Sequence, residues 1–246
     1  MTQSLIGRHS VALMPVISHA HGKGEDEGIK TMIDTQFKYF VYAALFIALC
    51  FCFNYQSLIT AWTGAGKYAG NLIVFLLIGN FFFDLLGYFM ANMGYALGDI
   101  KMNSFINIFK GIVSGILYYI VTKPYGIIGL LVVMITLNIC IDFIFFTYRL
   151  YKLGYLNMKF MRKSLKLWAM IIPLVSVAGL GFNYLYNLVI PIQMYIIKIL
   201  LNGISFTLFF IGIVLLLDKA LRTDITTMLS SVFKVNMNKQ TVLNEQ

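Results

Sequence analysis

Long apolar runs alternate with short polar or Gly/Pro-containing breaks along most of this chain. A helix needs about 20 apolar residues to cross the hydrocarbon core of a bilayer, and most of the runs are close to that length. Because water cannot satisfy the backbone there, each run predicts a spanning α-helix. The predicted spans are Tyr39–Ile59, Leu72–Leu97, Phe105–Val121, Ile127–Phe146, Leu165–Leu185 and Met194–Leu217.

The two ends of the chain differ from this apolar centre. Ser4–Ala20 resembles the end of another helix, either amphipathic or truncated. We therefore expect residues 1–38 to hold the end of a preceding helix and a charged cytoplasmic loop. Residues 39–217 are expected to form an all-α transmembrane bundle, and residues 218–246 a cytoplasmic tail.

The composition supports a membrane protein and argues against several soluble classes. Apolar residues make up 59% of the chain, charged residues only 12%, and the mean hydropathy is +0.80. The net charge of +9 does not indicate nucleic-acid binding, because Lys and Arg lie between apolar runs rather than on one polar face. His19, His21 and Glu25 lack the spacing of a metal site. The sequence predicts no enzyme, cofactor, metal or nucleic-acid partner.

The distribution of basic residues predicts which side of the membrane each loop faces. The densest basic cluster falls between the fourth and fifth predicted spans, as expected for a cytoplasmic loop. His21–Lys38, Gly98–Lys101 and the tail then also lie inside, whereas the opposite loops hold only Lys67 and Lys123. The cluster consists of Arg149, Lys152, Lys159, Arg162, Lys163 and Lys166.

Polar side chains recur at helical spacing inside three of the predicted spans. Ionisable groups in hydrocarbon cost several kcal/mol, so such stripes are expected to face a shared hydrated cavity. The third span carries Asn103, Asn107, Lys110, Ser114 and Tyr118; the second carries Asn80, Asp84, Tyr88, Tyr95 and Asp99; the fourth carries Asn138, Asp142 and Arg149. The candidate substrate-binding residues are Lys110, Asp84, Asn107, Asn103, Asn80, Ser114, Tyr118, Tyr88, Asp142, Asn138 and Arg149.

A purely structural interpretation of the same residues is also open. Asp84 and Lys110 could neutralise each other as an ion pair, while Asp142 and Lys198 reach water near the membrane surface. Gly111 and Gly115, beside the third-span stripe, predict close helix packing or room for a bulky ligand.

Several short motifs resemble those of a known transporter superfamily. Gly98-Asp-Ile-Lys101 is followed by an apolar span containing Asn107 and then by Lys123-Pro-Tyr-Gly-Ile-Ile-Gly129. Leu13-Met-Pro-Val-Ile-Ser18 and Trp62-Thr-Gly64 precede them. In this order the motifs resemble the multidrug/oligosaccharidyl-lipid/polysaccharide exporter superfamily, especially bacterial polysaccharide flippases of the O-antigen and capsule type.

The resemblance implies a carrier of the bacterial plasma membrane that moves a polyprenyl-diphosphate-linked oligosaccharide from the inner to the outer leaflet. It also implies two helical lobes, of which this chain would supply only the second and its trailing helices. Because alternating access needs one bundle moving against another, the expected partner is a missing N-terminal lobe, a second copy or another subunit.

The expected mechanism requires binding and movement but no covalent chemistry. Lys110, with Arg149 or Lys101, would attract the diphosphate, and Asn and Tyr side chains would bind sugar hydroxyls. Asp84 and Asp142 would hold these cations or carry a coupling ion. The alternatives are a membrane-embedded polysaccharide polymerase or lipid-linked sugar transferase, and a small-molecule exporter of the same superfamily.

Overall fold

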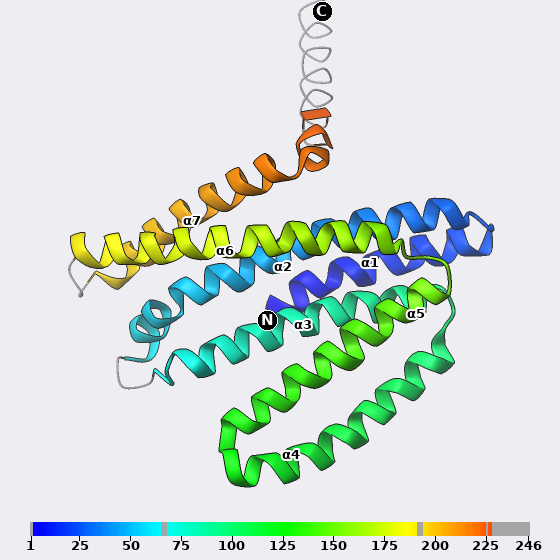
Figure 1. The fold of residues 1–246 in the computed structure, drawn as a ribbon, viewed down its shortest axis with the longest axis horizontal. Helices are drawn as coiled ribbons and strands as arrows, with labels where there is room; N and C mark the ends of the chain where they lie inside the picture. Colours follow the sequence, from blue (N-terminus) through cyan, green and yellow to red (C-terminus); the bar gives the residue numbers. More distant parts are fainter. Residues whose placement is uncertain (1, 65–67, 191–193, 225, 228–246) are drawn as a thin grey trace, which may run out of the picture.

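The computed structural model describes residues 2–64, 68–190, 194–224 and 226–227, and Figure 1 shows a bundle of long helices. Most of the predicted tail, residues 228–246, lies outside the described residues. The helices are α1 (Thr2–Gly22), α2 (Asp26–Thr63), α3 (Asn71–Ala96), α4 (Ile100–Leu137), η2 (Asn138–Phe145), α5 (Phe146–Lys152), α6 (Met158–Val189) and α7 (Tyr195–Leu217).

Five helical stretches are long and apolar enough to cross a membrane: α2, α3, α6, α7 and the stretch Ile100–Lys152. The last has 53 residues, which would extend about 80 Å if straight, more than twice the hydrocarbon thickness. It does not run straight, because Gly126 adopts φ 57° and ψ −141°, a conformation open to glycine. Figure 1 shows the chain turning back within α4. This stretch therefore contains two of the six predicted spans, and the predicted all-α membrane bundle is confirmed.

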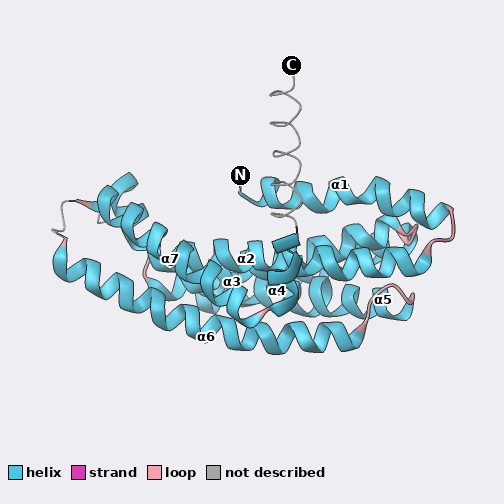
Figure 2. Cartoon of the chain, turned by 90° about the horizontal axis from the view of Figure 1, so that it is seen from above, coloured by secondary structure: helices cyan, strands magenta, loops and turns pink. Residues whose placement is uncertain are grey.

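Helix α1 packs along α3 and α2 and extends the bundle on one face. Figure 2 shows α1 on one side of the bundle and α6 on the other. The Ser18 hydroxyl donates to the carbonyl of Ala96 at 2.8 Å, and the Asn92 amide donates to the Ser10 hydroxyl at 2.9 Å. These contacts fix α1 against α3, the helix that carries much of the candidate site.

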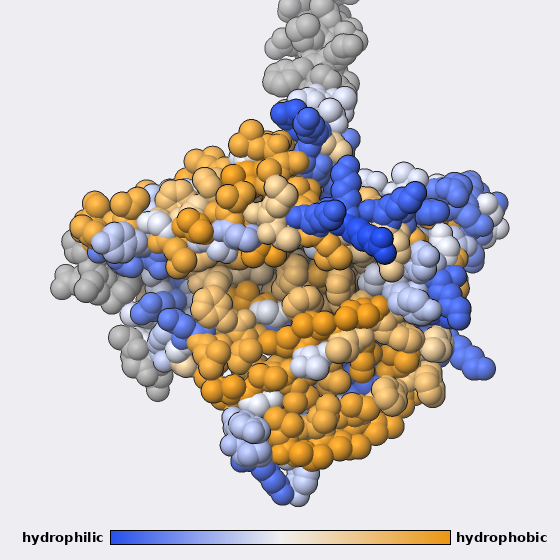
Figure 3. Space-filling model, in the orientation of Figure 1, coloured by the Kyte–Doolittle hydropathy of each residue, from blue (hydrophilic) through white to orange (hydrophobic). Residues whose placement is uncertain are grey.

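A cluster of aromatic side chains joins α2, α3 and α6. The ring of Phe37 lies 5.4 Å from that of Phe89 and 5.8 Å from that of Trp168, and Phe40 lies 4.9 Å from Phe89. All four side chains are buried. Large apolar side chains also cover much of the outside, which Figure 3 shows in orange. An apolar exterior of this extent is typical of a lipid-facing surface.

Candidate functional site

A polar cavity of about 220 Å³ lies between α3, α4 and the η2–α5 stretch. It contains five of the residues that the sequence analysis proposed for substrate binding, and they come from all three predicted stripes. The lining residues are Asp84, Gly87, Tyr88, Ala91, Asn92, Tyr95, Asn107, Lys110, Asp142 and Phe146.

Lys110 and Asp142 of this cavity belong to a polar network that extends to Asn138 and Asn80 beside it. The Lys110 ammonium group pairs with the carboxylate of Asp142 and donates to Asn138 Oδ1 at 2.8 Å. The Asn138 amide in turn donates to Asn80 Oδ1 at 3.0 Å. The network therefore joins α3, α4 and η2, and it keeps a charged group satisfied inside the bundle.

The structure corrects part of the structural interpretation drawn from the sequence. The ion pair of Lys110 is formed with Asp142, while Asp84 lines the same cavity. The prediction that Asp142 and Lys198 reach water is wrong, because their residues are only 8% and 6% exposed. Burial of Asp142 explains the difference, since a carboxylate without water needs a cationic partner.

Two local features bring Asp142 to this position. The residue lies in η2, an eight-residue π-helix, and π-turns are frequent at functional sites because they displace side chains from the α-helical register. Gly87 of α3 faces it directly. A Cβ atom at position 87 would collide with the Asp142 Cβ and lie 3.0 Å from its carbonyl carbon, so this close approach requires glycine.

A second ion pair joins α5 to the α3–α4 turn. Arg149 donates through Nε and Nη2 to the two carboxylate oxygens of Asp99, at 2.7 and 3.1 Å. The Asn107 amide donates to the Tyr95 hydroxyl at 3.1 Å. A bidentate arginine–carboxylate pair fixes geometry as well as charge, so Arg149 holds α5 against the turn that joins α3 to α4.

Three predicted site residues of the third span lie outside the cavity. Asn103 is buried and donates to the Ala91 carbonyl at 3.0 Å, and Ser114 donates to the Gly111 carbonyl of its own helix at 2.9 Å. Tyr118 does not line the cavity either. Of the residues in this stripe, Asn107 and Lys110 in its middle line the cavity.

The predicted close packing at Gly111 and Gly115 is not found in the described part of the chain. A Cβ atom at either position would meet nothing within 4 Å. This side of α4 is instead open and carries exposed apolar side chains such as Ile108, Ile112 and Ile116.

Other residues of the cavity were not among the predicted site residues. Asn92 follows Asp84 and Tyr88 at intervals of four, so the same periodicity could have identified it. Gly87 and Phe146 gave no such signal, because a glycine and an apolar side chain look like ordinary packing residues in a span.

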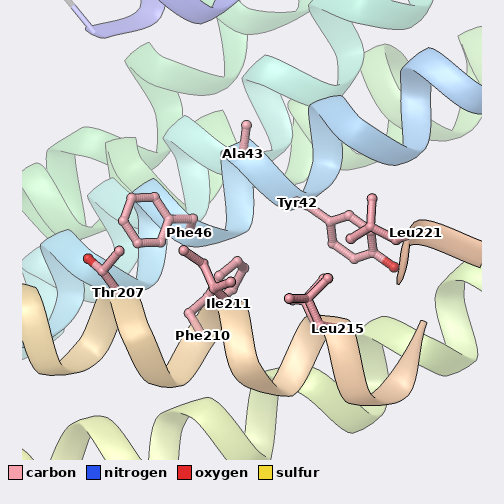
Figure 4. Close-up of a pocket in the computed structure, with 9 residues that line it drawn as sticks. Tyr42, Ala43, Phe46, Thr207, Phe210, Ile211, Leu215 and Leu221 are labelled. Carbon is pink, nitrogen blue, oxygen red and sulfur yellow. The ribbon is translucent and has the colours of Figure 1, made fainter. Parts of the chain in front are cut away.

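A larger cavity of about 380 Å³ lies between α2 and α7, and Figure 4 shows its lining. The side chains of Phe46, Phe210 and Ile211 line it together with Ala43 and Leu215. Its lining has no charged residue, whereas the smaller cavity holds Lys110 and two carboxylates. We therefore take the smaller, polar cavity as the candidate functional site.

Comparison with known proteins identifies the class of fold. No family model and no curated protein matches the chain. Among solved structures it is similar to "Lipid II flippase MurJ, inward closed conformation", with 16% sequence identity and a TM-score of 0.56. The match covers 85% of this chain and 43% of that protein, so the chain spans less than half of the flippase. The protein is thus an all-α integral membrane protein with the fold of part of that flippase.

Proposed function

We propose that this chain is one lobe of a membrane carrier that moves a polyprenyl-diphosphate-linked oligosaccharide from the inner to the outer leaflet of a bacterial plasma membrane. The observation that carries the proposal is a charged, amide-lined cavity inside the spans, centred on Lys110. Its support is the similarity to a lipid II flippase, a protein of the superfamily that the sequence motifs resemble.

The chemistry of the cavity suits a diphosphate with attached sugars. A lysine ammonium binds phosphate oxygens through charge-assisted hydrogen bonds. Without ligand, Lys110 is neutralised by Asp142, so an incoming diphosphate competes with that carboxylate for the same cation. Tyr88, Tyr95 and Asn107 line the same space and supply donors and acceptors for sugar hydroxyls.

The size of the cavity favours a lobe over a complete carrier. Its volume of about 220 Å³ lies below the roughly 300–1,000 Å³ of ordinary ligand pockets. It accommodates a phosphate group or one sugar, and the rest of the substrate requires a second wall. Transporters commonly place that wall on a second bundle that moves against the first. The second bundle is a preceding lobe, a second copy or another subunit.

Binding to the purified chain tests this proposal without requiring a complete transport cycle. A fluorescent short-chain polyprenyl diphosphate carrying a disaccharide is titrated into the protein in detergent micelles. Lys110→Ala should weaken binding by about tenfold or more, because a hydrogen bond to a charged group contributes about 1.5–3 kcal/mol. The matched control is Lys123→Ala, which removes an exposed lysine outside the cavity and should bind normally.

A second variant keeps the test informative if removal of Lys110 alone unfolds the protein. Lys110→Gln with Asp142→Asn removes both charges and keeps both shapes, so the fold is preserved while the cation is lost. Normal binding by this folded double variant would contradict the proposal. Stronger binding of small organic cations than of the diphosphate would favour the alternative of a small-molecule exporter.

A further inference from the structure

The first turns of α6 carry a continuous basic face. Lys159, Arg162, Lys163 and Lys166 are spaced by three and four residues, which places them along one side of the helix. The opposite side of the same turns is buried and includes Met161, Ser164 and Trp168. The basic side chains therefore point away from the bundle.

This basic face has no acidic counterpart in the described part of the chain. No Asp or Glu occurs between Asp142 and Asp218 in the sequence. The ion pairs of the described residues involve His21, Lys38, Lys110 and Arg149, and none involves the basic face of α6. Four neighbouring cations without an internal partner are available to an anion outside the chain.

The same side of α6 becomes apolar immediately after Lys166. Met170, Leu174 and Val177 continue the spacing of the basic face and are 53%, 46% and 71% exposed. A change from basic to apolar along one exposed helix side marks the boundary between lipid headgroups and hydrocarbon. The four cations therefore lie at the level of the headgroups.

A second polar segment, residues 218–224, lies on the same face of the molecule and holds Lys219 and Arg222 together with Asp218 and Asp224. Figure 3 shows hydrophilic atoms over the first half of α6 and over the segment that follows α7, where Lys219 and Arg222 are exposed. Asp218 fixes the start of this segment, because its Oδ1 accepts from the backbone N–H groups of Ala220 and Leu221 at 3.1 and 3.2 Å. The Asp218 and Asp224 carboxylates lie 3.5 and 3.9 Å from Lys38, and Lys219 and Arg222 are the exposed cations of this segment.

We propose that the basic face of α6 binds the anionic headgroups of phospholipids in the leaflet on the side of the α5–α6 connection. Lysine and arginine at a membrane surface attract anionic lipids, and each contributes about 1 kcal/mol. The occupant is a bilayer lipid because the cations continue directly into a lipid-facing apolar surface. This site is separate from the polar cavity and does not depend on the transported substrate.

Lipid retention by the purified protein tests the proposal. Delipidated protein in detergent is titrated with phosphatidylglycerol or with phosphatidylcholine of the same acyl chains, and retained lipid is measured by native mass spectrometry. The test variant combines Arg162→Gln, Lys163→Gln and Lys166→Gln. The control removes the same number of charges from exposed positions elsewhere, by Arg8→Gln, Lys23→Gln and Lys123→Gln.

The wild-type and control proteins should retain phosphatidylglycerol in preference to phosphatidylcholine. The test variant should bind phosphatidylglycerol at least about tenfold more weakly, as the loss of three surface cations predicts. Unchanged retention by the test variant would overturn the proposal, as would an equal loss in the control or equal retention of phosphatidylcholine. Displacement of the lipid by an equal concentration of glycerol phosphate would indicate a free-phosphate site and would also overturn it.

Discussion

The polar and the apolar cavity described above lie at helix interfaces that are built in opposite ways. The polar interface, between α3 and the α4–η2 stretch, holds the network of Lys110, Asp142, Asn138 and Asn80. The apolar interface, between α2 and α7, encloses the larger cavity. Within a bilayer, lipid is as apolar as a helix surface, so apolar packing alone gives little directional preference. The polar interface therefore specifies a unique arrangement, and the apolar one tolerates change.

The apolar interface is held mainly by contacts between aromatic rings. Phe206 is fully buried and lies 5.8 Å from Phe53 and 6.1 Å from Phe46 between ring centres. Among the described side chains, one hydrogen bond joins α2 to α7 within the spans: the Asn202 amide donates to Asn54 Oδ1 at 3.1 Å. Such interhelical bonds contribute about 0.6 kcal/mol on average.

Breaking the ion pair of the polar interface should give the largest effect on stability. Lys110→Met leaves the buried carboxylate of Asp142 without its cation, and loss of one partner from a buried pair costs about 3–5 kcal/mol. Thermal unfolding in detergent micelles, followed by circular dichroism, should show a strongly lowered midpoint.

A double variant provides the control for this prediction. Lys110→Met with Asp142→Leu removes both charges, so the unfolding midpoint should recover most of the loss. Equal destabilisation by the single and double variants would show that the two side chains are not energetically coupled, and the contrast between the interfaces would then fail.

Crowding the polar interface should have the next largest effect. Gly87→Ala places a methyl group against Asp142 of η2, and an overpacked helix contact costs about 1–3 kcal/mol. Gly111→Ala is the matched control, because its methyl group meets nothing within 4 Å, and it should be neutral or slightly stabilising. The unfolding midpoint of Gly87→Ala should therefore be lower than that of Gly111→Ala. Equal midpoints would mean that α3 and η2 can move apart without loss of stability.

The fold could be predicted from the sequence more completely than the site. The length and spacing of the apolar runs were enough to predict the membrane-spanning helices. In lipid, the backbone N–H and C=O groups must hydrogen-bond within the protein, so few structures other than a helix are possible. Even the reversal between the third and fourth spans was predicted near its observed place, at Gly126. Its exact form, a single glycine within an otherwise helical stretch, was not predicted.

The partners inside the site depend on three-dimensional details that periodicity does not contain. The stripes contribute Asp84, Tyr88, Asn107, Lys110 and Asp142 to the lining of one cavity. They could not show which carboxylate pairs with Lys110, because the π-helical register of η2 sets the position of Asp142. Ser114 shares a helix face with Asn107 and Lys110 but lies one turn farther along α4, beyond the cavity lining.

The smallest effect is expected at the C-terminal end of α7, beside the apolar interface. The Tyr42 hydroxyl donates to Asp218 Oδ2 at 2.8 Å, and Lys38 lies 3.5 Å from the same oxygen. Burial alone would raise the pKa of Asp218, but the hydrogen bonds from Tyr42 and the Leu221 backbone, with Lys38 nearby, bring this pKa below its ordinary value. Tyr42→Phe should therefore cost about 1 kcal/mol at neutral pH.

The pH dependence of that difference shows whether the carboxylate is responsible. Because the pKa of Asp218 is lower in the folded than in the unfolded protein, its stabilisation is present above the ordinary pKa and is lost as the pH falls below about 4. The gap in unfolding midpoint between wild type and Tyr42→Phe should thus persist from pH 5 to pH 8 and narrow in acid. Tyr39→Phe removes the equivalent bond to Asp224, whose carboxylate is 46% exposed, and should change stability less because water replaces the lost partner. If the difference in unfolding midpoint between wild type and Tyr42→Phe does not change with pH, the stabilisation comes from packing of the tyrosine ring and not from the carboxylate. The two interfaces would then differ only inside the membrane.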